Sequence, residues 1–392
     1  MPQVNPRILV WAREAAGLGI DEAAKSLQLG GARQSGPDAL EEYERGTKAP
    51  SRPLLVKMAK AYRRPLLTFY LPQPPAKSDR GEDFRTLPGD REFESASKLD
   101  ALVRDVFVRQ RLVRSILEDT DEAEPLSFVG SIALTQPVDY AAKVICKRLD
   151  FDINEFRRKK SVEESFNYIR GLTEKLGVFV LLIGNLGTHH TALSTDIFRG
   201  FALAERVAPF IVVNDQDAKV AWSFTLLHEL AHIWLGRTGL SGADFEQKIE
   251  RFCNDIASEI LVPEAEMDEL RNLSGNRHEA ISTISDFASQ RRVSRALVAY
   301  RLLKRRQIDR KQWSDLTEEF RRSWEEERAK RKEQATEATG GPNYYVVKRH
   351  RVGNALVEVT RRAIAEGFVT PTKAGRILGV RPTNVQALVG AA

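Results

Sequence analysis

The feature that most constrains the fold of this chain is a pair of histidines, His228 and His232, inside an apolar segment. The chain has 392 residues but only six histidines, so two of them four residues apart are informative. Leucine and isoleucine recur around the pair, which predicts a buried helix from about residue 221 to 235, ended by Gly236. Side chains at i and i+4 project from one helix face, so both imidazoles are expected to point the same way.

With Glu229 between them, the two histidines form an H-E-x-x-H pattern, in which both imidazoles ligate one Zn²⁺. Glu229 can reach the open coordination position of the metal without ligating it. There it would take a proton from a zinc-bound water and later deliver that proton to a leaving amine. The alternative is two helix histidines that only pack or cap, but unpaired histidines are costly in so apolar a segment. The sequence therefore predicts a catalytic zinc site.

A catalytic zinc ion needs a third protein ligand, and no third histidine follows at the spacing H-E-x-x-H-x-x-G-x-x-H. We therefore expect a carboxylate from the helical segment 250–259. Glu250 is the first candidate, with Asn254 one turn further on as a hydrogen-bond partner for a ligating histidine. Glu259 and Glu246 are the competing candidates for the third ligand.

Other residues with metal-binding or catalytic side chains have weaker claims. Cys253 lies inside the same segment and is interpreted as a small buried residue rather than a ligand. His189 and His190 follow a predicted strand and are interpreted as loop histidines, with oxyanion stabilisation as the alternative role. No neighbouring residues suggest a role for His278 or His350.

Composition excludes several classes of protein. Two cysteines are too few for a disulfide scaffold or a Cys-rich zinc site. The sequence contains no run of about 18 apolar residues, so no membrane span is predicted. No apolar leader follows the first methionine. We therefore expect a cytoplasmic protein with no membrane partner. The balance of 60 Lys and Arg against 54 Asp and Glu is compatible with nucleic-acid binding, but the surplus is too small to establish it.

Residue patterns predict an α+β fold with a small sheet. The predicted strands are 178–183, 198–204 and 209–214, the last two joined by a hairpin turn. The predicted helices include 99–119, 141–149, 156–176 and two within 281–307. Zinc peptidases commonly hold substrate as an added strand along a sheet edge, so the two strands just before the histidines point to a polypeptide substrate.

Four stretches carry a family resemblance. They are Phe-Arg-Gly-Phe at 198–201, Ile-Val-Val-Asn at 211–214, the H-E-x-x-H segment at 223–232, and residues 250–263. The last is similar to the E-x-x-A-N-x-F-A-x-E-L-L-x-P segment of the ImmA/IrrE metallopeptidases, with Cys253 for the usual Ala and Ile256 for the usual Phe. The chain resembles that family most closely over about residues 175–265.

This resemblance implies a zincin-like domain of the gluzincin type. It favours His228, His232 and Glu250 as zinc ligands, with Asn254 behind them and Glu229 as the catalytic residue. Members of the family act as regulators that cleave a repressor or an antitoxin-like transcription factor. The implied substrate is therefore a partner protein, expected to be a helix-turn-helix repressor or an antitoxin.

Residues 5–72 resemble an Xre/Cro-type helix-turn-helix domain, on the segments 11–18, 22–24 and 43–50. Its expected recognition helix carries acidic residues, which oppose docking on phosphates: Asp38, Glu41, Glu42 and Glu44. The cations predicted to touch the DNA backbone are Arg33, Arg45, Lys48 and Arg52. DNA binding and protein–protein contact therefore both stay open for this domain.

Residues 371–380 also resemble a small helix-turn-helix, within a basic and helical C-terminal part. The alternative function is thus a DNA-binding regulator or antitoxin-like binding protein whose peptidase fold serves as a sensor or scaffold. The predicted segments are a helix-turn-helix domain at 1–72, a linker at 73–82, a zinc metallopeptidase domain at 83–270, a helical, helix-turn-helix-like region at 271–335 and a C-terminal helical region at 336–392.

Overall fold

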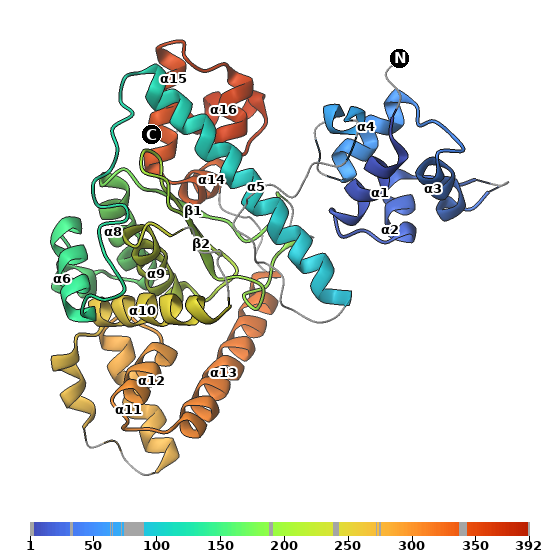
Figure 1. Cartoon of the computed structure of the whole chain (residues 1–392). Helices are drawn as coiled ribbons and strands as arrows, with labels where there is room; N and C mark the ends of the chain where they lie inside the picture. Colours follow the sequence, from blue (N-terminus) through green and yellow to red (C-terminus); the bar gives the residue numbers. More distant parts are fainter. Residues whose placement is uncertain are drawn as a thin grey trace. The chain divides into compact units, whose positions relative to one another are not determined.

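The structure is a computed structural model that describes residues 4–31, 34–62, 64, 66–71, 73, 90–187, 191–237, 243–271, 273, 276–336 and 343–390. The chain forms two compact units, a smaller one of residues 1–105 with 185–193 and a larger one of residues 106–184 with 194–392. Helices dominate both units, and a three-stranded sheet lies in the larger one (Figure 1). This arrangement confirms the predicted α+β class.

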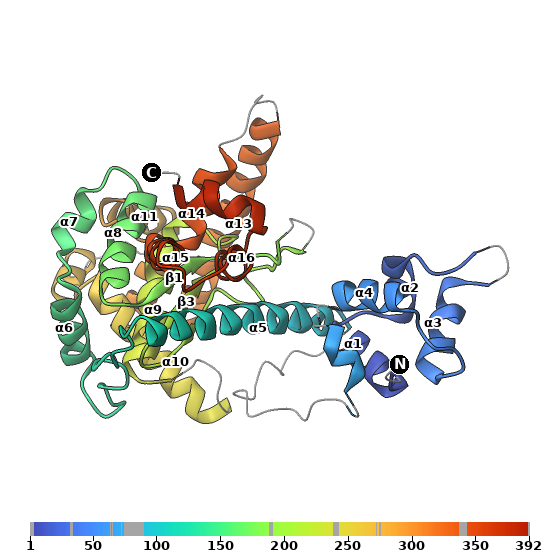
Figure 2. The same ribbon diagram turned by 90° about the horizontal axis from the view of Figure 1, so that it is seen from above.

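The smaller unit is helical (Figure 2). Its elements are α1 (Pro6–Glu14), α2 (Ile20–Leu27), α3 (Gly36–Arg45), α4 (Arg52–Ala61) and the 3₁₀ turn η1 (Leu66–Tyr70). The side chains of Asn5, Ser35 and Ser51 each accept a backbone N–H at the start of a helix, which fixes where α1, α3 and α4 begin. Buried apolar side chains from all these elements form one core: Ile8, Leu9, Leu27, Leu40, Leu55, Met58 and Phe69.

The sheet of the larger unit has the strand order β1-β3-β2. Its strands are β1 (Phe179–Leu182), β2 (Gly200–Leu203) and β3 (Phe210–Val213). β1 pairs parallel with β3, and β2 pairs antiparallel with β3 as a hairpin. The amide of Gln110, on α5 (Asp90–Asp119), donates to the carbonyls of Leu203 and Ala208 at the two ends of the hairpin turn. All three predicted strands and the hairpin are therefore confirmed.

Helices form most of the rest of the larger unit. They are α5 (Asp90–Asp119), which enters the larger unit at Val106, α6 (Val138–Leu149), α7 (Ile153–Arg158), α8 (Val162–Lys175), α9 (Trp222–Trp234), α10 (Ala243–Leu261), α11 (Arg277–Gln290), α12 (Arg295–Lys304) and α13 (Arg310–Thr336). The short 3₁₀ turns η3 (Lys219–Ala221) and η4 (Glu264–Leu270) precede α9 and follow α10. One hydrophobic core extends from Phe128 to Phe320 and includes side chains on both sides of residue 270.

The prediction of one continuous helix over 156–176 was wrong, because the structure has two helices there. α7 ends at Arg158 and α8 begins at Val162, where the Ser161 hydroxyl accepts the backbone N–H of Glu164. A serine that caps a new helix competes with continuation of the old one. The predicted break near residue 293 is confirmed, since α11 ends at Gln290 and α12 begins at Arg295.

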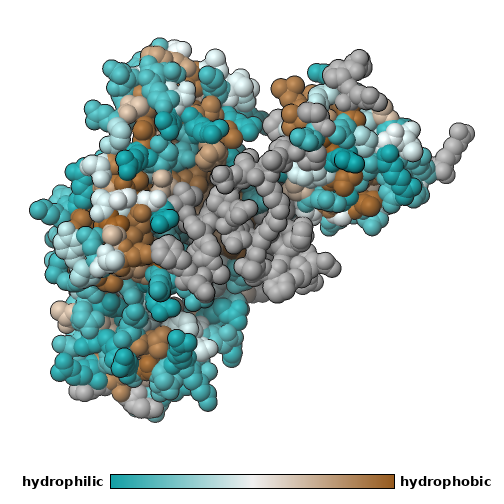
Figure 3. All heavy atoms as spheres, viewed as in Figure 1, coloured by the Kyte–Doolittle hydropathy of each residue, from teal (hydrophilic) through white to brown (hydrophobic). Residues whose placement is uncertain are grey.

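The C-terminal elements belong to the larger unit. They are α14 (Tyr344–Val352), α15 (Asn354–Ala365), α16 (Pro371–Leu378), the 3₁₀ turn η5 (Pro382–Asn384) and α17 (Val385–Gly390). α14 contacts β1, and α15 lies beside α16 (Figure 1). On the face shown in Figure 3, hydrophilic residues predominate and hydrophobic ones form separate patches. None of the described helices combines the length and the apolar character that crossing a lipid bilayer requires.

Candidate metal centre

Helix α9 holds both histidines in place because nearly all of its side chains are buried. It packs against β2, β3, α8 and α10. The rings of His228 and His232 have centroids 4.9 Å apart, and their Nε2 atoms are 3.1 Å apart. The His232 side chain is 3 % exposed and that of His228 is 12 % exposed. The two imidazoles therefore converge at one place near the protein surface.

Helix α10 brings Glu250 to the same place. One carboxylate oxygen of Glu250 lies 3.1 Å from Nε2 of His228, and the other lies 3.1 Å from Nε2 of His232. The apolar face of α10 packs on α9 through buried residues such as Ile256, and this packing sets the rotation of α10 about its axis. Among the described residues, His228, His232 and Glu250 form the one group whose ligand atoms all lie within 4.8 Å of one another.

This donor set fits a zinc ion. Two ligand atoms about 2.1 Å from one zinc ion, at a tetrahedral angle, lie about 3.4 Å apart. The three donors here are within a few tenths of an ångström of that spacing, at 3.1 Å for each pair given. Two imidazole nitrogens and one carboxylate are also the ligand types found in catalytic zinc sites that keep a fourth position open.

The electrostatics of these groups favour positive charge at this place. Burial opposes ionisation of Glu250, but hydrogen bonds with both histidines outweigh it and hold the pKa of the carboxyl well below its usual range. Burial also opposes protonation of His232, but its contacts with Cys253 and Glu250 raise the pKa of the imidazole to about 11. A metal ion at this position satisfies the same donors in deprotonated form, because metal ions compete with protons for such ligands.

Glu229 lies beside the donor set and is only 6 % exposed. Burial raises the pKa of its carboxyl, and the nearby charges of His228 and His232 partly offset that rise. A carboxyl with a raised pKa is a better proton acceptor than an ordinary glutamate. The carboxyl of Glu229 can therefore accept a proton more readily than an ordinary glutamate.

The first residue of β2 touches this base. A Cβ on Gly200 would lie 2.8 Å from Oε1 of Glu229 and 2.6 Å from Cγ2 of Thr225, closer than real Cβ contacts. Only glycine fits here without displacing the Glu229 carboxylate. Gly200 lies in the Phe-Arg-Gly-Phe run that carries the family resemblance, and that run is the one sequence signal for its role.

The neighbours of the donor set differ in part from those expected. The Nδ1 atoms of both histidines are buried and have no hydrogen-bond partner among the described residues, so the contact expected from Asn254 is not formed. Instead, the thiol of Cys253 lies against the ring of His232. Cys253 is fully buried, as expected, and it is not among the grouped ligands.

The structure separates Glu250 from its competitors. Glu259 is turned away from the histidines, where one of its carboxylate oxygens accepts from Arg301 at 2.7 Å. The other accepts the backbone N–H of Glu264 at 3.2 Å. The side chain of Glu246 lies outside the described residues.

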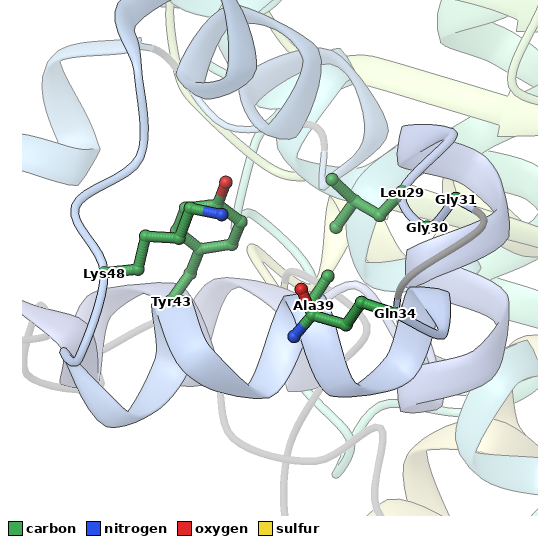
Figure 4. Close-up of a pocket in the computed structure, with 7 residues that line it drawn as sticks. All are labelled: Leu29, Gly30, Gly31, Gln34, Ala39, Tyr43 and Lys48. Atoms are coloured by element: carbon green, nitrogen blue, oxygen red, sulfur yellow. The ribbon is translucent and has the colours of Figure 1, made fainter.

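In the smaller unit, two of the four predicted DNA contacts are paired with acidic side chains of α3. Arg45 forms an ion pair with Glu41, and Lys48 lies 3.9 Å from Glu42. Arg52 is exposed, and Arg33 lies outside the described residues. The amine of Lys48 lies over the ring of Tyr43, 5.3 Å from its centroid, at one side of an open cavity of about 490 Å³ (Figure 4). The residues that line this cavity are Leu29, Gly30, Gly31, Gln34, Ala39, Tyr43 and Lys48.

Among the described residues, neither His278 nor His350 belongs to the group of metal-binding side chains. His189 and His190 lie outside the described residues. His350, on α14, lies with Nε2 3.1 Å from Oδ1 of Asn167 on α8, a partner that the sequence analysis did not find. No local sequence pattern indicates this contact, because the two residues are 183 positions apart along the chain.

Comparison with known proteins places this centre in a metallopeptidase-type domain. Residues 174–303 match the model of the IrrE N-terminal-like domain, a peptidase family (M78). The match begins at the end of α8, ends in α12 and includes Glu229 and all three grouped donors. It confirms the resemblance to the ImmA/IrrE family over this domain and supports a metallopeptidase. No curated protein and no solved structure matches the chain.

Proposed function

We propose that this protein is a zinc-dependent endopeptidase. The observation that carries the proposal is the convergence of His228, His232 and Glu250 beside the buried carboxylate of Glu229. The match of residues 174–303 to a peptidase family supports it. Two histidines, one carboxylate and an adjacent acid are together the groups that metal-assisted peptide hydrolysis needs.

In this proposal His228, His232 and Glu250 hold the zinc ion. Zinc, when bound, lowers the pKa of a coordinated water and polarises the carbonyl of the scissile peptide. Glu229 accepts the proton of the attacking water on its carboxylate and donates that proton to the nitrogen of the leaving amine. Its burial assists both steps, because a raised pKa brings the acid and base forms closer in energy near neutral pH.

The sheet edge supports a polypeptide substrate. β2 is an edge strand, and its first residue, Gly200, touches Glu229. A substrate strand added to this edge would run past the base and the metal ligands. Together with the family resemblance, this favours a partner protein as substrate, and we propose a helix-turn-helix repressor or an antitoxin-like regulator.

Metal content and turnover test the proposal separately. The purified chain is expected to hold one zinc ion per molecule by elemental analysis, and Glu250→Gln and His232→Ala are expected to lose it. Glu229→Gln should retain zinc and lose cleavage by about 10³-fold or more, since it removes the proton acceptor. The matched control is Glu118→Gln on α5, an exposed carboxylate that pairs with Arg114.

The substrate assay uses purified helix-turn-helix repressors and antitoxin-like regulators as candidate substrates, with loss of the full-length regulator as the readout. A chain without zinc, or a Glu229→Gln variant that cleaves as fast as the unaltered chain, would refute the peptidase. Regulator binding without cleavage, in a zinc-loaded chain, would instead favour the alternative function, in which the peptidase fold is a sensor or scaffold for a DNA-binding regulator.

A further inference from the structure

The positive charge of the chain is concentrated in its C-terminal elements. Residues 343–390 contain eight Lys and Arg and two Glu. Of the 60 basic and 54 acidic residues in the chain, 52 and 52 lie elsewhere, so these elements account for the whole net charge of +6. A basic segment on an otherwise neutral chain is the usual electrostatic signature of nucleic-acid binding.

Within these elements, α16 and α17 have the backbone of a helix-turn-helix. α16 ends at Gly379, whose φ of +64° turns the chain. The chain then passes so close to α16 that a Cβ on Gly375 would lie 2.8 Å from the carbonyl oxygen of Val380. η5 and α17 follow directly and pack back on α16. Buried apolar residues hold the two helices together: Ala374, Ile377, Leu378, Val385 and Leu388. A small residue at the crossing and a glycine in the turn are what a tight helix-turn-helix requires.

The exposed side of this motif carries free cations. Lys373 and Arg376 lie three residues apart on α16, and Arg381 lies just before η5. All three are exposed, and none of them forms an ion pair within the part of the chain that the structure describes. Arg361 and Arg362, on α15, are by contrast paired with Glu358 and Glu122.

We propose that α16–α17 is a DNA-binding helix-turn-helix that docks on duplex DNA. Lys373, Arg376 and Arg381 contact phosphates, and the segment 382–390 enters the major groove. Thr383 and Gln386 are exposed at the start of that segment, where a recognition helix contacts base edges. Cations that have no carboxylate partner are available to phosphates without first breaking an internal ion pair.

Buried contacts attach this motif to the body of the larger unit. The guanidinium of Arg170, on α8, donates to the backbone carbonyls of His350, Arg351 and Val180, and so joins α14 to β1. Glu174 pairs with Arg170 and accepts the backbone N–H of Ala355 at 3.3 Å, at the start of α15. DNA held by α16–α17 is therefore held by the same unit that contains the metal centre.

The test is fluorescence anisotropy of the full chain with a pool of random-sequence 30-base-pair duplexes, measured over a range of salt concentrations. The variant Lys373→Gln/Arg376→Gln/Arg381→Gln is expected to lower affinity at least tenfold at about 100 mM salt. Its plot of log K against log salt should be flatter by about 2 to 3, since each phosphate contact contributes about 0.9. The matched control, Lys147→Gln/Arg148→Gln/Lys175→Gln, removes the same charge from exposed sites on α6 and α8.

A second variant, Arg45→Gln/Lys48→Gln/Arg52→Gln, removes the predicted DNA contacts of the smaller unit and is expected to behave like the control. Selection of tight binders from the pool should yield a sequence preference that Gln386→Ala alters. Absence of duplex binding at micromolar protein, equal losses in the test and control variants, or loss only in the smaller-unit variant would each overturn the proposal. The assay needs neither zinc nor cleavage, so its failure is distinguishable from failure of the peptidase.

Discussion

The chain carries two surfaces that invite comparison with DNA-binding motifs, α2–α3 in the smaller unit and α16–α17 in the larger one. Their cations differ in one respect that the sequence composition hides. Arg45 and Lys48 of the smaller unit lie against glutamates of α3, whereas the three cations on α16 and its turn have no carboxylate partner among the described residues. Availability of positive charge, more than its amount, distinguishes the two surfaces.

This difference has a simple energetic basis. An exposed ion pair contributes only about 0–1 kcal/mol to stability, so the pairs on α3 do little to hold the fold. These pairs do, however, place a carboxylate beside Arg45 and another beside Lys48. A phosphate that approaches either cation is therefore repelled by a like charge. Exposed ion pairs can therefore decide what a surface binds while contributing little to the stability of the protein.

The largest expected effect concerns how each surface is attached to its unit. Arg170→Ala should destabilise the larger unit by about 3–5 kcal/mol, because it leaves Glu174 buried and unpaired. Arg13→Ala removes the corresponding pair with Glu44 in the smaller unit. Its cost should be lower, because Arg13 donates to one backbone carbonyl, that of Leu18, and Arg170 donates to three. Urea unfolding and hydrogen exchange of residues 344–365 measure the difference. Unchanged exchange there in Arg170→Ala would contradict the proposed attachment.

Removal of negative charges on α3 should make the α2–α3 surface bind DNA more like the α16–α17 surface. In a chain that already carries the three glutamines at 373, 376 and 381, Glu41→Gln/Glu42→Gln frees Arg45 and Lys48. We expect duplex affinity to rise by up to about thirtyfold at low salt, because two exposed pairs of up to about 1 kcal/mol each sum to about 2 kcal/mol. Anisotropy measures it. An unchanged affinity would mean that α3 is unsuited to DNA for reasons of shape.

The helix caps give a smaller and more local contrast. Ser35 accepts the backbone N–H of Asp38 at the start of α3, and Thr370 accepts that of Lys373 at the start of α16. Each substitution by alanine should cost about 1 kcal/mol of stability by urea unfolding. Only Thr370→Ala is expected to weaken DNA binding as well. Weakening of equal size in Ser35→Ala would assign DNA contact to both surfaces.

The smallest expected effect is on how the stability of each unit depends on pH. Burial, with the charge of Arg170 beside it, lowers the pKa of His350. Below about pH 6.5 the unfolded chain therefore binds the proton more readily than the folded one, and the contribution of this histidine to stability is lost as pH falls. His350→Gln should flatten the stability profile of the larger unit between about pH 7 and 5. The helices α1 to α4 contain no histidine, so the stability of the core that they form in the smaller unit should show no such change. A profile unaltered in His350→Gln would contradict the assignment.

Much of the metal centre could be predicted because its signals are local. The i, i+4 histidines, the strands and the stop at Gly236 depend on residues within one or two helical turns. Glu250 and Glu259 were harder to separate. At about 100° per residue, nine residues place them on opposite sides of α10. Which side faces α9 is decided by packing, and Arg301, which holds Glu259 away, lies 42 residues further on.

Contacts between distant segments explain most of what the sequence did not indicate. The break between α7 and α8 depends on the Ser161 cap, and the Arg170 contacts join residues that are 180 positions apart. The pair of Arg45 with Glu41 is different, because its i, i+4 spacing is visible in the sequence. Arg45, predicted to touch the DNA backbone, thus has an acidic partner on its own helix.

The close approach of Gly200 to Glu229 has a consequence for how this protein can vary. Any side chain at position 200 meets the carboxylate of the base and the methyl group of Thr225, which is a clash at the site of the chemistry and outside the main core. A variant with alanine at 200 would remain folded and keep its metal ligands while its base was displaced. One substitution, 28 positions before His228, would thus abolish the proposed peptidase activity and leave the metal-binding side chains in place. The distance from a peptidase to a protein that only binds its partner is therefore a single residue at this site.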